Sequence, residues 1–108
     1  MQRLPADITV VQATGDLNSE TSSQLYLVVA DELLREPTQL VLDVSDLTSV
    51  DKAAVAGLVS ASGLAGESDI SFCLVAAHVS PVLTTLAEAG VLERFEVFPT
   101  VRAATGGR

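Results

Sequence analysis

The sequence predicts a single α/β domain with a mixed, mostly parallel sheet of four to five strands and helices packed on it. First, the chain of 108 residues fits one compact domain, so residues 1–108 are expected to form one unit. Second, 48% of the residues are hydrophobic but only 4% are aromatic, which predicts a core of aliphatic side chains. Third, strand-like and helix-like segments alternate, as in sheets whose parallel strands are joined by helices.

The first half of the chain contains two predicted strands with a helix between them. A β-branched run predicts a strand over 8–13, and a turn follows it. Asn18 and Ser19 offer N-cap oxygens for a helix that stops before Pro37. Its apolar residues recur at helical spacing: Leu25, Val28, Val29 and Leu33. The apolar run over 40–44 is typical of a strand buried on both faces.

The second half repeats this alternation. A helix is predicted to begin at Asp51, whose carboxylate suits an N-cap, and to end at the glycines of 63–66. The longest strand-like run covers 70–77. Ser80-Pro81 then predicts the start of a third helix, which Gly90 closes. Three short segments finish the chain: a strand over 95–98, a helical turn over 101–104 and a frayed tail over 105–108.

The charge of the chain narrows the class of partner. Six Lys and Arg residues against fourteen Asp and Glu residues give a net charge of −8. A nucleic-acid-binding protein needs a basic surface to displace counterions from phosphates, so no nucleic-acid partner is expected. An acidic surface suits a protein partner of basic or mixed charge, although it also serves solubility alone.

The location predicted from the sequence is cytoplasmic. Every apolar stretch is well below the roughly 20 residues that a membrane span needs, so no membrane insertion is expected. Pro5 and Asp7 precede any apolar run, which is unlike a signal peptide. The single cysteine, Cys73, cannot form an internal disulfide, in agreement with a reducing compartment.

Residues that could carry catalysis are scarce. His78 is the only histidine, which excludes metal sites with several imidazoles, and it is expected in a loop before the third helix. Cys73 lies mid-strand without a CxxC partner and is expected to be a buried, inert thiol. Turn and cap roles explain Asp43 and Asp46. The sequence therefore predicts a protein that is not an enzyme and binds no metal or cofactor.

Three motifs, which together span nearly the whole chain, resemble one family. Gly15-Asp16-Leu17-Asn18 is similar to the element G-x-L-D before a first helix. The segment 42–51 resembles L-D-L-S-x-V-x-x-I-D. The last third resembles a strand, a helix that starts with S-P and the closure G-L-x-x-x-F, at 74–76, 80–82 and 89–95. In this order and spacing, the motifs resemble STAS domains, and among these the bacterial anti-sigma factor antagonists.

The resemblance implies a partner switch that regulates transcription. In that family the unphosphorylated domain binds a kinase-like anti-sigma factor and thereby frees a sigma factor. The kinase then phosphorylates a serine at the start of the second helix, and the complex dissociates. A phosphate at a helix N-terminus is favoured in the free protein, whereas at a flat interface its desolvation costs several kcal/mol.

The sequence departs from the family where phosphorylation occurs. The family has D-S-S-G with the second serine as acceptor, and this chain has Asp51-Lys52-Ala53-Ala54. The position equivalent to the phosphoserine is thus Ala53, and the acidic residue of G-x-L-D is Asn18. These five residues are the predicted partner-binding positions. A cation at Lys52, in the first turn of a helix, opposes the helix dipole, which indicates either a functional contact or a solvated side chain with no role.

The resulting hypothesis is an anti-sigma factor antagonist that phosphorylation at the usual position cannot switch off. Ser45, Thr48 or Ser49 could replace the missing acceptor, or regulation could come from abundance or another partner. The alternative function is a STAS subunit of an ABC-type lipid-transport complex, because its motif V-D-x-x-G is nearly as close to 50–54. A small-ligand or nucleotide-binding domain ranks last, since nothing in the sequence positions phosphates or a base.

Overall fold

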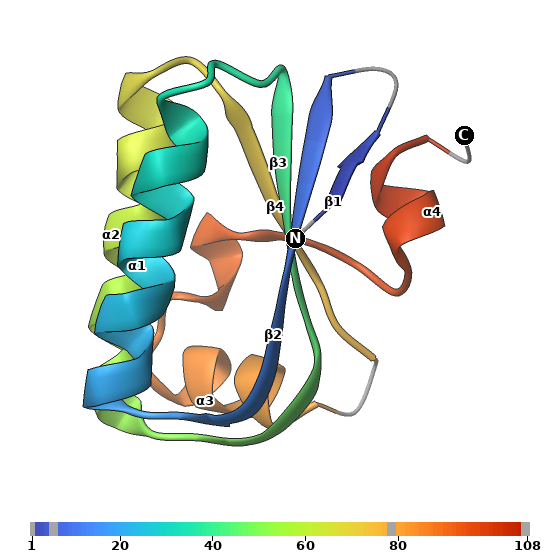
Figure 1. Cartoon of the computed structure of the whole chain (residues 1–108). Coiled ribbons are helices and arrows are strands. Elements are labelled where there is room, and N and C mark those ends of the chain that lie inside the picture. Colours follow the sequence, from blue (N-terminus) through green and yellow to red (C-terminus); the bar gives the residue numbers. More distant parts are fainter. Residues whose placement is uncertain (1, 5–6, 78–79, 107–108) are drawn as a thin grey trace.

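A five-stranded sheet with helices on both faces forms the scaffold (Figure 1). The computed structural model describes residues 2–4, 7–77 and 80–106. The strands are β1 (Gln2–Leu4), β2 (Ile8–Leu17), β3 (Gln39–Val50), β4 (Ser71–Val75) and β5 (Glu96–Phe98). The helices are α1 (Ser19–Leu33), α2 (Lys52–Glu67), α3 (Pro81–Glu88), the 3₁₀ turn η1 (Leu92–Arg94) and α4 (Val101–Ala104).

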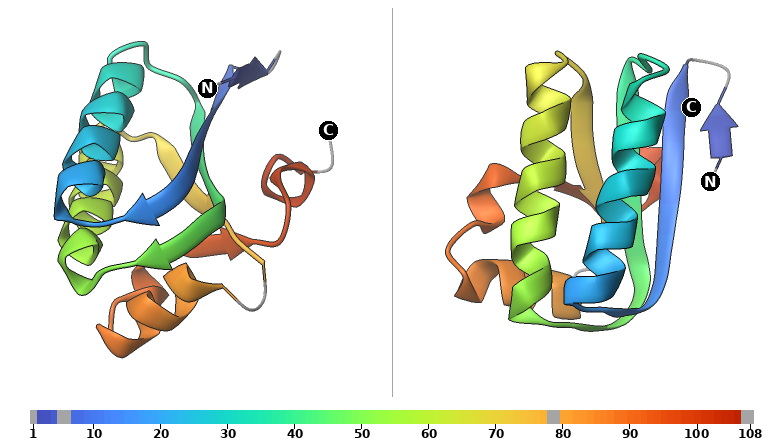
Figure 2. Two further views of the ribbon diagram at one scale, coloured as in Figure 1. Left: turned by 60° about the horizontal axis from the view of Figure 1, so that its bottom comes forward. Right: turned by 60° about the vertical axis from the view of Figure 1, so that its left-hand side comes forward.

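The strands lie in the sheet in the order of the sequence, β1-β2-β3-β4-β5. β1 pairs antiparallel with β2, and the other neighbours are parallel. Right-handed crossovers in a sheet of sequential order place α1, α2 and α3 on the same face, while α4 covers part of the other (Figures 1 and 2). The predicted fold class, a mixed and mostly parallel sheet with packed helices, is confirmed.

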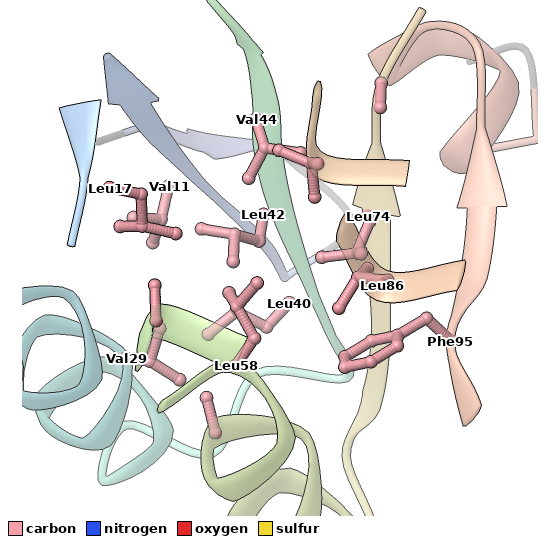
Figure 3. Packing of buried hydrophobic residues seen from close by; sticks show 14 of the residues in the cluster. Val11, Leu17, Val29, Leu40, Leu42, Val44, Leu58, Leu74, Leu86 and Phe95 are labelled. Carbon is pink, nitrogen blue, oxygen red and sulfur yellow. The ribbon is translucent and has the colours of Figure 1, made fainter. Parts of the chain in front are cut away.

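Aliphatic side chains fill both sides of the sheet, as the composition predicted. On the main face, Val29 of α1, Leu58 of α2 and Leu86 of α3 meet the inner side chains of the strands (Figure 3). A smaller cluster lies under α4 and includes Val41 and Cys73. Cys73 is 1% exposed, which confirms that the thiol is buried, and burial raises its pKa.

Two strands are longer than predicted, and one strand was not predicted. β2 and β3 continue through the polar turn signals because two irregularities in their ladder absorb the extra residues, between Gln12 and Thr14 and between Gly15 and Asp16. Gly15 supports the second irregularity with a φ of +82°. β1 pairs with the first residues of β2, a contact that local sequence does not encode. β4 ends at Val75, before the predicted end at residue 77.

The helix starts were predicted well and one helix end was not. Asn18, Asp51 and Ser80 are the N-caps of α1, α2 and α3, as predicted. The prediction that Gly63 helps to end the second helix is wrong, because α2 continues through it to Glu67. An interior glycine costs helix stability but does not break a helix whose other face is well packed.

Val28 and Thr105 differ from what the sequence predicted for them. Val28, expected in the apolar stripe of the first helix, is 38% exposed. Thr105, expected at the start of a frayed tail, is buried, and its backbone N–H donates to the carbonyl of Val101 at 3.0 Å. The predicted loop residue His78 lies outside the described residues.

Two glycines of α2 provide a matched test of helix packing. A Cβ at Gly63 would meet no atom within 4 Å, whereas a Cβ at Gly57 would lie 3.1 Å from the Cβ of Ser22 in α1. We expect Gly63→Ala to raise the free energy of unfolding by about 0.5–1 kcal/mol, because alanine favours the helix. Gly57→Ala is expected to gain clearly less, since the two helices must separate slightly. Urea unfolding measures both, and equal gains would contradict the close α1–α2 packing.

Candidate functional site

The first turns of α1 and α2 lie side by side at one edge of the sheet (Figures 1 and 2). The pairing of β2 with β3 continues to Leu17 and Val50, the last residues of these strands. The backbone N–H of Asp51 then donates to the carbonyl of Leu17 at 2.8 Å. Because each helix begins directly after its strand, this pairing brings Asn18 and Asp51 to neighbouring positions.

Asn18 caps α1 with a complete capping box. Its Oδ1 accepts hydrogen bonds from the backbone N–H groups of Glu20 and Thr21, both at 3.0 Å. The hydroxyl of Thr21 in turn accepts from the backbone N–H of Asn18 at 2.8 Å. These contacts satisfy N–H groups that a helix start otherwise leaves unpaired. The amide at this position therefore has a structural role of its own.

The first turn of α2 is less tightly capped and more exposed. The carboxylate of Asp51 accepts from the backbone N–H of Ala53 at 3.3 Å. Asp51, Lys52 and Ala53 are exposed, whereas Ala54 is fully buried and packs in the main core. The structure thus places three of the predicted partner-binding residues on one accessible turn and assigns Ala54 to the interior.

The hydroxyls proposed as substitute phosphosites are engaged with carboxylates. Thr48 and Ser49 donate to Oδ1 of Asp16 at 3.0 and 2.7 Å, and these bonds, Ser49 first, lower the pKa of that carboxyl. The hydroxyl and the backbone N–H of Ser45 both donate to Oδ1 of Asp43. Sequence reasoning missed the role of Asp16, because its partners lie more than 30 residues away on β3.

Neither a metal centre nor a membrane span is found in the part of the chain that the structure describes. Within it, His, Cys, Asp and Glu side chains form no cluster of three or more that could hold a metal ion. Among the described helices, none is long and apolar enough to cross a membrane.

The two helix caps are expected to differ in strength. We predict that Asn18→Ala lowers the free energy of unfolding by about 1 kcal/mol, because the capping box is lost. Asp51→Ala is expected to cost less, since its side chain makes a single bond of 3.3 Å. Asn18→Asp is the matched control and keeps most of the stability. Denaturant titration of the three variants checks this, and an equal loss for both alanine variants would refute the difference.

Solved structures with the same fold include regulators and transporter domains. An anti-sigma factor antagonist from Mycobacterium paratuberculosis superposes with a TM-score of 0.80 at 20% identity, over 93% of this chain and 84% of that chain. The antagonist SpoIIAA in its unphosphorylated form gives 0.77 at 12% identity, over 96% and 90%. The STAS domain of a SulP transporter from Vibrio cholerae gives 0.73 at 19% identity, over 94% and 80%.

At these identities the likeness establishes the fold, which both functional classes share. No curated protein matches the sequence. The family model of the STAS domain, however, matches residues 3–104, which is nearly the whole chain and includes every described strand except the first residue of β1. The chain therefore belongs to the STAS domain family.

Proposed function

We propose that this STAS domain is a non-enzymatic, cytoplasmic binding module that sequesters a kinase-like anti-sigma factor. The observation that carries the proposal is the exposed first turn of α2, with Asp51, Lys52 and Ala53 next to the start of α1. In the bacterial anti-sigma factor antagonists that the sequence resembles, the equivalent turn is the segment on which partner switching depends. Two neighbouring solved structures are antagonists of this kind.

The electrostatics of this turn support a protein partner. The N-termini of α1 and α2 lie at the same edge of the sheet, where each helix presents the positive end of its dipole. Lys52 adds a positive charge there, although the chain as a whole carries −8. Asp51 places a negative charge beside it. A surface that holds both signs within one turn favours a partner with a complementary pair of charges, which gives specificity more than affinity.

The same turn argues against control by phosphorylation. Ala53, the position equivalent to the family phosphoserine, is exposed but has no hydroxyl. A phosphate on Thr48 or Ser49 would lie beside the carboxylate of Asp16, and like charges would repel. We therefore propose that the abundance of the protein, and not a covalent switch, sets how much anti-sigma factor is bound.

Charge reversal at the first turn of α2 tests the proposed interface. Wild type, Asp51→Arg and Lys52→Glu are used for affinity capture from native lysate, and the bound proteins are identified by mass spectrometry. We expect wild type to recover a kinase-like anti-sigma factor and both variants to lose it. Arg102→Glu, an exposed charge reversal on the far side of the sheet, is the matched control and should retain the partner.

The capture experiment also distinguishes the proposed function from the alternative one. Recovery of transporter ATPase and permease subunits by wild type would identify the chain as a STAS subunit of an ABC-type lipid-transport complex. Recovery of an anti-sigma factor by all variants alike would leave the family function intact but refute the interface.

Restoring a hydroxyl at residue 53 tests the proposed loss of the switch. Incubated with the captured kinase and ATP, wild type is expected to gain no phosphate within residues 45–53. Ala53→Ser combined with Asn18→Asp is expected to gain one phosphate at residue 53 and to dissociate, because the exposed turn can accept the hydroxyl. Mass spectrometry and size-exclusion chromatography report both steps. Phosphate on Ser45, Thr48 or Ser49 of the wild type would contradict the proposal.

A further inference from the structure

The outer side of α1 exposes large apolar side chains. Among the described residues, the large hydrophobic side chains that are exposed are Leu27, Val28 and Leu34, and all three lie on α1 or at its C-cap. Leu27 is 67% exposed and Leu34 is 81% exposed. These two are seven residues apart, so they lie two turns from each other on the same side of the helix. Two exposed leucines in one line mark a face that a partner can cover.

These leucines border a groove between α1 and α2, the two helices that lie side by side over the sheet (Figure 2). One part of the groove, of about 530 Å³, begins at Ser19 and Ala53 and extends to Leu27. A second part, of about 430 Å³, extends from Leu27 to Leu34 and Ser68. Because both parts share Leu27, the groove follows most of the length of α1.

Small residues on α2 keep this groove open. Ala56, Gly57 and Ser60 form its wall, and Gly57 allows α2 to approach Ser22 of α1 closely. The lining of this part of the groove thus combines small and hydroxyl-bearing side chains with Tyr26 and Leu27 of α1. Leu27 and Leu34, at positions i and i+7 of the chain, form a line of apolar side chains along the groove. This spacing matches that of the apolar residues on an amphipathic helix.

The charge around the groove selects the occupant. Of the carboxylates of α1 and α2, Glu20, Asp31 and Glu67 are exposed and Glu32 is buried, and the exposed cations nearby are Lys52 and Arg35, which adjoin the lining residues Ala53 and Leu34 in sequence. Asp31 lines the groove itself. Glu67 is exposed and lies three residues after Leu64, on the same side of α2. A second copy of the chain would bring another acidic groove and a further net charge of −8, so self-association is disfavoured.

We propose that the α1–α2 groove binds an amphipathic helix of a protein partner whose polar face is basic. Leucine-type side chains of that helix pack on Leu27 and Leu34, and its lysines or arginines face Asp31 and Glu67. The proposal does not depend on the anti-sigma assignment. The groove begins at Ala53, so one partner can contact both this groove and the first turn of α2.

Two synthetic peptides of about 15 residues, long enough to span α1, test the proposal on the ¹⁵N-labelled chain. One peptide has leucine on one helical face and lysine on the other, and its counterpart has glutamate in place of each lysine. Amide NMR titration is expected to show saturable shifts around Leu27, Leu34 and Leu64 with the lysine peptide. The glutamate peptide should bind at least about tenfold more weakly, and added salt should weaken the binding of the lysine peptide.

Exposed leucines allow a variant that removes this line of apolar side chains without opening the core. Leu27→Ser combined with Leu34→Ser is expected to lower the affinity for the lysine peptide by about tenfold or more. Val28→Ser is the matched control, because Val28 is also exposed on α1 but lines a different cavity, facing β2. It should change the affinity by less than about twofold. Lys52→Glu should not weaken the lysine peptide, which separates this site from the proposed anti-sigma interface.

Four results would overturn the proposal. Equal binding of both peptides would show that the charge does not select the occupant. Unchanged affinity in the double serine variant, or shifts confined to residues away from α1 and α2, would show that the groove is not the site. Shifts of the groove amides with protein concentration alone, together with a dimer in sedimentation, would identify a second copy as the occupant.

Discussion

The parallel pairing of β2 with β3, maintained to the last residue of each strand, holds the candidate site together. It ends with Leu17 opposite Val50 and is closed by the hydrogen bond from the N–H of Asp51 to the carbonyl of Leu17. Since α1 and α2 start directly after these strands, their first turns cannot separate without breaking this ladder. The same constraint holds the helices close enough for Gly57 to meet Ser22.

This arrangement also explains what the fold disfavours. Open α/β sheets usually bind ligands where the strand order reverses, because the crossovers there diverge to opposite faces and leave a crevice. Here the strands follow the order of the sequence, and no reversal occurs among the described strands. The described strand order therefore lacks the crevice at which such sheets usually bind nucleotides, the function ranked last from the sequence. The groove between α1 and α2 follows most of the length of α1, which suits a macromolecular partner.

Local signals in the sequence predicted the elements, and contacts between distant residues decided the rest. Asn18, Asp51 and Ser80 each carry a side-chain oxygen that caps a helix. The starts of α1, α2 and α3 could therefore be predicted from the sequence alone. The hydrogen bonds of Asp16 to residues on β3 could not, because they depend on the register of two strands. The burial of Ala54 could have been predicted, since it lies four residues before Leu58 on the packed side of α2.

Amide hydrogen exchange of the chain, alone and with the purified anti-sigma factor that we propose as its partner, tests whether the first turns of α1 and α2 form the interface. We expect the partner to slow exchange in the first turns of α2 and α1, where Lys52, Ala53 and Ser19 are exposed in the free chain. We expect little change in α4, which lies on the opposite face of the sheet. Protection confined to α3 and α4, with unchanged exchange at the start of α2, would contradict the proposed interface.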